Sequence, residues 1–119
     1  MRIIVTVLLT LFATIAYSDY NEGDKFKCKS KLAVRVFQKP HHINEMKPQE
    51  FTFTVAQNSI EFYSKAHLSS NSMKLHYLVN SSLAAYNEFS SFNLDLGKFH
   101  YADAYSFGAA LITGTCVKI

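Results

Sequence analysis

The sequence predicts an all-β protein, an antiparallel up-and-down barrel or sandwich of seven or eight short strands after an N-terminal signal helix. Three observations support this class. Apolar and polar residues alternate with period two in several segments, and turn-forming residues separate those segments at hairpin spacing. No apolar stripe of period 3.6 continues beyond the first 18 residues, so no long amphipathic helix is expected there.

Residues 1–18 have the three parts of a cleavable secretory signal. Arg2 supplies the positive start, residues 3–16 form an apolar run broken only by threonines, and Ala16 and Ser18 are small residues before the cut. A membrane-spanning helix needs about 20 apolar residues, whereas this run has 14. We expect cleavage, a secreted or periplasmic location, and membrane contact only during export; an uncleaved anchor or a buried helix are the alternatives.

Residues 19–119 are expected to form a single β domain with a thin core. The net charge of the whole chain is +3, and it falls to +2 without Arg2. No run of five basic residues occurs, so we expect no nucleic-acid partner. The basic cluster alternates with other residues and is expected to form the solvated face of a strand: Lys25, Lys27, Lys29 and Lys31.

The first predicted strand covers residues 26–36. Its alternation predicts one buried face along the whole strand: Phe26, Cys28, Ser30, Leu32, Val34 and Val36. Residues 38–49 follow, and Pro40 and Pro48 bracket them. Proline cannot donate a backbone hydrogen bond to a sheet, so this segment is expected to be a long loop or a short helical turn.

The next predicted unit is a hairpin of residues 51–57 and 60–64 around an Asn58–Ser59 turn. A polar turn precedes a strand over residues 73–79, in which Met73, Leu75, Tyr77 and Val79 are expected to face inward. Residues 83–96 fit a helix or strand spacing nearly equally well. Residues 99–104 alternate again, and residues 106–119 are expected to form a long terminal strand.

The two cysteines, Cys28 and Cys116, lie near the two ends of the expected domain. Only one intramolecular pairing is possible, and in an exported protein we expect it to form. It would close a loop of nearly 90 residues, which the chain-entropy model values at about 4–5 kcal/mol. If the first and last strands are neighbours, this bond clamps the seam where the sheet closes.

The sequence contains no pattern that predicts catalysis, a metal site or a cofactor. His100 and Asp103 lie among many serines, but the Gly-x-Ser-x-Gly elbow of serine hydrolases is absent. The carboxylates are dispersed, and no Cys/His cluster has the spacing of a structural zinc site. A metal held by His76 and His100 would need adjacent strands and a third ligand, so we expect no metal.

Aromatic residues are plentiful. Most phenylalanines occupy the inward-facing positions of the predicted strands, where they are expected to pack in the core. Several tyrosines and histidines could instead form a surface for a ligand or partner. The candidates for this surface are Tyr63, His76, Tyr86, His100 and Tyr101. Asn80 starts an Asn-Ser-Ser glycosylation triplet, which matters only in a eukaryotic source.

The C-terminal segment 113–119, with Gly114, Thr115 and Cys116, resembles the close of small exported proteins of Gram-negative bacteria. That resemblance implies a periplasmic location, β structure and a cysteine in the terminal strand, without an activity. Residues 26–28 are similar in placement to the early Cys strand of c-type lysozyme inhibitors, which are small periplasmic barrels. Their inhibitory Ser-Gly-x-x-Tyr loop has no counterpart, and the nearest segment, 63–67, has neither the glycine nor the tyrosine at the positions that the loop requires.

These observations favour a non-enzymatic binding module that holds a small apolar ligand or meets a protein partner. A barrel of this length has little interior volume, so we expect the site on the surface or rim. The alternatives are a structural envelope protein without a discrete ligand, a protein similar to the lysozyme inhibitors, and an enzyme. An exposed apolar groove would favour binding, whereas a filled interior without a concave patch would favour the structural role.

Overall fold

The computed structural model describes residues 18–37, 42–64, 71–105 and 108–119. The expected signal helix lies outside them. The strands in these ranges are β1 (Lys25–Phe37), β2 (His42–Glu45), β3 (Glu50–Val55), β4 (Ser59–Ser64), β5 (Ser72–Val79), β6 (Ser82–Tyr86), β7 (Ser90–Asp95), β8 (Lys98–Tyr105) and β9 (Gly108–Lys118).

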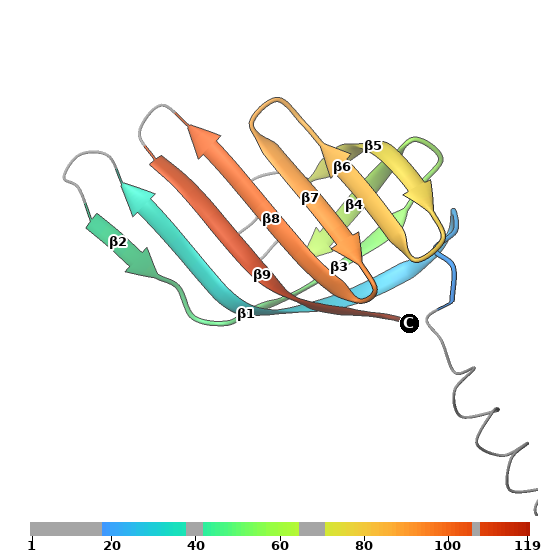
Figure 1. Ribbon diagram of the computed structural model, residues 1–119, viewed down its shortest axis with the longest axis horizontal. Helices are drawn as coiled ribbons and strands as arrows, with labels where there is room; N and C mark the ends of the chain where they lie inside the picture. Colours follow the sequence, from blue (N-terminus) through green and yellow to red (C-terminus); the bar gives the residue numbers. More distant parts are fainter. Residues whose placement is uncertain (1–17, 38–41, 65–70, 106–107) are drawn as a thin grey trace, which may run out of the picture.

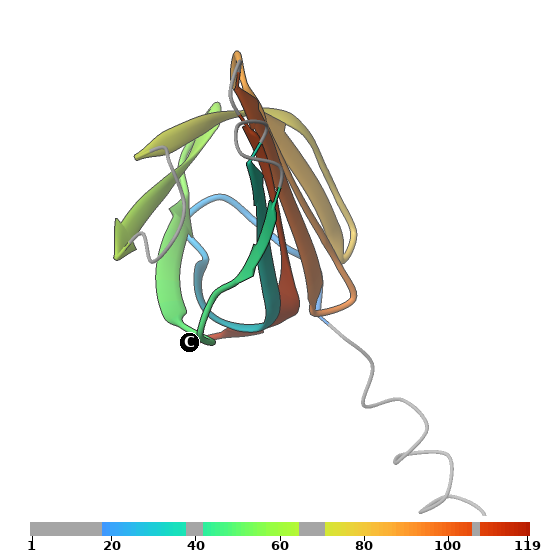
Figure 2. The ribbon, with the colours of Figure 1, turned by 90° about the vertical axis from the view of Figure 1, so that its left-hand side faces the viewer.

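The strands form one antiparallel sheet that closes on itself (Figures 1 and 2). From β3 to β9 each strand pairs with the next in sequence, β1 pairs with β3, and the long β1–β9 ladder closes the barrel. Eight strands make this barrel, while β2 is an additional strand at the edge of β1. The predicted all-β class is therefore confirmed, and of the two expected architectures, barrel or sandwich, the protein forms the barrel. Closure removes most exposed edges.

Strand β2 corrects the expectation of a loop or helical turn at residues 42–45 of the segment 38–49, whereas residues 46–49 form no strand and residues 38–41 lie outside the described residues. It pairs with the second half of β1, with Val36 opposite Ile43 and Phe37 opposite His42. The reason is a difference in strand length. β1 has 13 residues, but β3 covers only its first five, Lys25 to Lys29. β2 runs antiparallel to β1 and covers part of the edge that β3 leaves open.

A β-bulge in β1 corrects the expectation of a single buried face. The register of β1 against β9 shifts between Ser30 and Leu32. Before the shift Phe26, Cys28 and Ser30 are buried; after it Ala33 is buried and Leu32 is 42% exposed. One extra residue exchanges the two faces of a strand because side chains alternate with period two. Leu32 and Val36 therefore lie on the outside of the barrel.

The same effect occurs in β5, where the register shifts between Leu75 and Tyr77. Met73 is buried as expected, but Tyr77 and Val79 are exposed. The ambiguous segment 83–96 forms strands β6 and β7 and no helix. Leu83, Ala85, Phe92 and Leu94 from these two strands point into the core.

Aromatic rings fill the barrel interior. Phe26, Phe51, Phe53, Phe92 and Phe99 are each at most 1% exposed. Their rings stack or meet edge to face, with centroids 5.0 Å apart for Phe26 and Phe53 and 5.2 Å apart for Phe51 and Phe99. Such contacts add to the burial of apolar area in stabilising a core. The expected packing of phenylalanines is confirmed, and the interior is occupied by protein.

The predicted disulfide is present and joins the strands that close the barrel. Cys28 of β1 and Cys116 of β9 lie directly opposite each other, with Cα atoms 4.0 Å apart, although the two residues are 88 positions apart in sequence. The bond therefore clamps the seam between the first and last strands.

Candidate functional site

The outer surface of β7, β8, β9 and the second half of β1 forms a continuous wall that faces the viewer in Figure 1. We call its apolar part the upper wall. The ladder registers arrange its side chains in two rows. One row is Ile43, Val36, Ala109 and Ala104, and the other is Val34, Leu111, Ala102 and Ser91.

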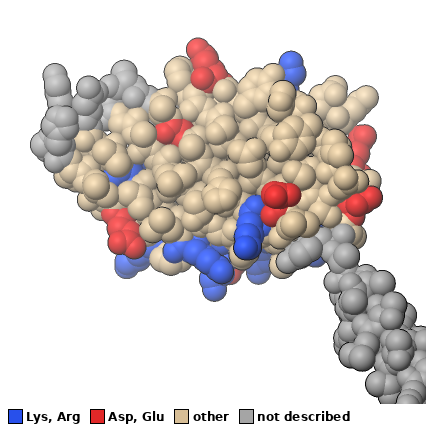
Figure 3. Space-filling model, in the orientation of Figure 1, with Lys and Arg blue, Asp and Glu red and all other residues tan. Residues whose placement is uncertain are grey.

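The upper wall exposes branched apolar side chains to solvent. Ile43 is 72% exposed, Leu111 46% and Val36 45%. The rows carry no charge until Glu45, which lies opposite Val34 at the β2 edge. Figure 3 shows the corresponding broad surface as mostly uncharged, with only small areas of acidic and basic residues in it. The bulge in β1 creates part of this surface because it turns Val36 outward.

A trough of about 420 Å³ lies at the β7–β8 end of the upper wall. Tyr86 and Phe89 line one side, and they are 43% and 53% exposed. Ala102 and Ala104 of β8 form a floor of small side chains. Glu88, in the turn before β7, adds a carboxylate to the lining. Small floor residues beside large aromatic ones make a concave surface on an otherwise convex barrel.

An aromatic corner continues the trough onto β5. The ring of His76 lies 6.1 Å from that of Tyr86 and 5.7 Å from that of Tyr77. His76 occupies the bulge of β5, which carries Tyr77 to the outer surface. Bulges often redirect side chains in this way. His76 and Tyr86, two residues predicted from sequence for a binding surface, are thus neighbours here.

The other predicted surface residues lie elsewhere. Tyr63 is exposed on β4, and the Lys25 ammonium lies 5.7 Å from its ring centre. His100 lies on the outer wall opposite Thr113, lower than the trough. Tyr101 is fully buried, so its inclusion in an exposed surface is wrong. Its position in β8 between two outward residues turns its side chain into the core.

Tyr101 belongs to a polar cluster inside the barrel. Its hydroxyl donates to Asp103 Oδ2 over 2.9 Å and lies 3.4 Å from Ser90 Oγ. The Arg35 guanidinium lies 3.8 Å from the same Asp103 oxygen. Arg35 reaches this cluster because the β1 bulge turns it inward. The buried Asp103 carboxylate is thus paired with a cation and a hydroxyl, as buried charges in proteins usually are.

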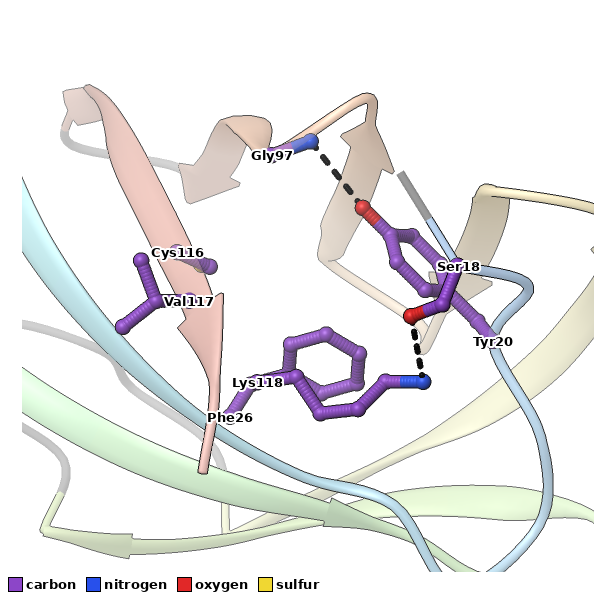
Figure 4. A pocket seen from close by; sticks show the side chains of 7 residues that line it. All are labelled: Ser18, Tyr20, Phe26, Gly97, Cys116, Val117 and Lys118. Carbon is purple, nitrogen blue, oxygen red and sulfur yellow. Dashed lines mark hydrogen bonds between the residues drawn. The ribbon is translucent and has the colours of Figure 1, made fainter. Parts of the chain in front are cut away.

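A second hollow, of about 160 Å³, lies at the base of the barrel (Figure 4). Tyr20 closes it from the segment before β1: its ring meets Phe26 edge to face at 4.9 Å, and its hydroxyl accepts a hydrogen bond from the Gly97 N–H over 3.0 Å. Lys118 Nζ donates to Ser18 Oγ over 3.1 Å. These contacts anchor the start of the domain, so we assign the base hollow a structural role.

The described residues contain no group of three His, Cys, Asp or Glu side chains placed to hold a metal ion. Within the same ranges, no helix has the length and apolar character needed to span a membrane.

Comparisons with known proteins found no matching family model, no significantly similar curated protein and no significantly similar solved structure. The geometry of the outer wall therefore carries the functional argument.

Most residues of the upper wall and trough have no sequence pattern that marks them as a binding surface. Local alternation predicts Val36 in the core because its position continues the pattern of Phe26 and Cys28. Ala102 and Ala104 have small apolar side chains that do not indicate binding. Phe89 lies in segment 83–96, whose spacing fits a helix and a strand nearly equally well. The phase change that exposes Val36 depends on pairing with β9, which local alternation does not reveal.

Proposed function

We propose that the protein is an exported, non-enzymatic binding module that meets a protein partner through the upper wall and its trough. The observation that carries this proposal is the exposed, nearly uncharged face that joins Ile43, Val36 and Leu111 to Tyr86 and Phe89. Contiguous apolar patches of this kind are uncommon on monomeric proteins and mark interaction sites. Exposed tyrosines beside a concave surface are typical anchors of protein interfaces.

Two features favour a protein partner over a small apolar ligand. Aromatic rings occupy the barrel interior, where small barrels hold such ligands. The trough is open and shallow and does not enclose a molecule, and its residue Ala102 also belongs to the apolar row that contains Leu111. Small-molecule sites bury most of their ligand's surface.

Export is part of the proposal, to the periplasm or the exterior. It is supported by the leader-like residues 1–18 and by the disulfide, since disulfides persist mainly in oxidising compartments. The competing structural role is favoured by the filled interior, but it gives no reason for an exposed apolar trough. We therefore place it second.

Site-directed photocrosslinking in the native envelope tests the proposal. A photoreactive residue is placed at Ala102, on the trough floor, and in a separate protein at Asn93, an exposed position on β7. We expect a discrete adduct from position 102 only, and we expect Leu111→Lys to abolish it because a charge would enter the apolar row.

Asn93 is the matched control because it lies on the same outer wall, opposite His100. Adducts of equal yield from both positions, or no adduct from position 102, would contradict the proposed interface and favour the structural role. Circular dichroism of Leu111→Lys checks that the barrel remains folded, as expected for an exposed residue.

A further inference from the structure

A third hollow lies on the outer wall below the apolar rows, and its lining is basic and hydroxylic. Its volume is about 190 Å³. Lys31 comes from β1, Lys98 and His100 come from β8, and Thr113 and Thr115 come from β9. Phe99 and Gly114 complete the lining, and no acidic residue belongs to it. We call it the basic hollow.

The ladder registers explain why these donors converge. Lys98 lies opposite Thr115, and His100 lies opposite Thr113, so the four side chains form two adjacent outward pairs. Lys31 occupies the bulge of β1, next to the position where Ser30 faces Gly114. Gly114 allows the backbone of β1 and the Phe99 ring to lie close to β9, because a Cβ atom at this position would lie 2.7 Å from the Phe99 ring and 2.8 Å from Ser30 Cα.

The surrounding charges favour an anion. Lys29 lies opposite Thr115 on the other side of β9, so Thr115 sits between two lysine positions. The nearest acidic positions in the ladders are Asp95, opposite Lys98, and Glu50, opposite Lys29. Glu50 is already engaged, with its carboxylate 3.5 Å from Lys27 Nζ. Figure 3 shows basic side chains gathered along the lower edge of this face.

We infer that the basic hollow is a binding site for a phosphoryl group. Two ammonium groups, two hydroxyls and an imidazole approach from three strands, so they can donate to several oxygens of a tetrahedral anion at once. A carboxylate has only two oxygens and would leave donors without acceptors. The hollow is open to solvent, and its volume of about 190 Å³ leaves room for a phosphoryl group with part of its hydration shell.

This inference goes beyond the proposed function, because it concerns a different part of the wall and no residue of the trough lines the basic hollow. The phosphoryl group could belong to a soluble phosphorylated molecule or to a lipid headgroup. Both present the same chemistry to the hollow.

Titration with inorganic phosphate at constant ionic strength, followed by amide NMR shifts, tests the site. We expect saturable shifts at residues 98–100 and 113–115. The double variant Lys31→Gln/Lys98→Gln should bind about tenfold more weakly, since each lysine supplies one screened ionic contact. Lys47→Gln/Lys74→Gln is the matched control: it removes the same charge from exposed positions outside the hollow and should bind like the parent protein.

Equal weakening in both double variants, or shifts that do not saturate, would overturn the inference. A second arm identifies the source with vesicles of phosphatidylcholine, with and without phosphatidic acid. Co-sedimentation that requires phosphatidic acid and is lost only in Lys31→Gln/Lys98→Gln indicates a headgroup. Saturable binding of free phosphate without co-sedimentation indicates a soluble ligand. Co-sedimentation lost equally in both variants would exclude the hollow as the lipid contact.

Discussion

Lys118 connects the last strand to the start of the domain through three groups. Its ammonium lies 3.0 Å from Asp24 Oδ2, and it donates to the Asp19 carbonyl over 2.8 Å and to Ser18 Oγ over 3.1 Å. Partial burial raises the pKa of Asp24. Hydrogen bonds from the Asn21 N–H and from Lys118, together with the positive charge of Lys118, lower the pKa by more than burial raises it, so the net shift is downward. The folded protein thus favours the ionised carboxylate.

The lowered pKa of Asp24 predicts an acid-dependent contribution to stability. A group whose pKa is lower in the folded state stabilises the fold above its unfolded pKa, and loses that effect as the pH falls through the folded pKa. We expect Asp24→Asn to lower the free energy of unfolding at pH 7 by about 0.5–1 kcal/mol, because the pair is partly exposed. Below pH 3.8, the ordinary pKa of the group, the difference from the parent protein should shrink.

Urea unfolding at a series of pH values measures this difference. Glu22→Gln is the control, because Glu22 is an exposed neighbouring carboxylate outside the ion pairs of the described chain. A deficit of Asp24→Asn that is independent of pH would contradict an electrostatic origin.

Among the structural elements, the bulged β1 strand has the largest influence on the surface. Its first half contributes Phe26 and Cys28 to the core, whereas its second half sends Arg35 inward and Val36 outward. The bulge therefore supplies the inner ion pair with Asp103, the apolar row of the upper wall and the Lys31 corner of the basic hollow. Gly114 on β9 makes the bulge possible, since a side chain there would meet the backbone of Lys29 and Ser30.

Gly114→Ala is predicted to destabilise the barrel by about 3 kcal/mol, because the added methyl group overpacks the β1–β9 ladder. Urea unfolding measures the change. Ala102→Val is the control: it adds two methyl groups on the adjacent strand, where the side chain is exposed, and should change stability by no more than about 0.5 kcal/mol. Equal stability of Gly114→Ala and the parent protein would show that the ladder tolerates a wider spacing.

The whole molecule is a barrel whose closure depends on strands from opposite ends of the chain. The β1–β9 ladder runs from Phe26 opposite Lys118 to Phe37 opposite Gly108. Formation of this ladder brings together residues that are separated by almost the full length of the domain in sequence, which costs a large amount of chain entropy. The Cys28–Cys116 bond spans 88 residues and removes part of that cost by restricting the unfolded chain.

Loss of the disulfide should therefore destabilise the protein by about 4–5 kcal/mol in the chain-entropy model. Chemical unfolding of Cys28→Ala/Cys116→Ala against the oxidised parent measures this difference. Reductant should destabilise the parent protein and leave the double variant unchanged. A small difference between parent and variant would indicate that the ladder closes without the covalent link.

Local alternation in the sequence was sufficient to predict an all-β barrel or sandwich and the inward phenylalanines, because residue types directly express burial with period two. The presence of two cysteines was sufficient to predict a disulfide between the terminal strands. The tertiary structure decided barrel over sandwich, the presence of β2, and which side of β1 and β5 faces solvent after each bulge. It also assembled the trough and the basic hollow. The physical reason is that a bulge is defined by pairing between strands, and one unpaired residue reverses every side chain after it without any change in the local pattern.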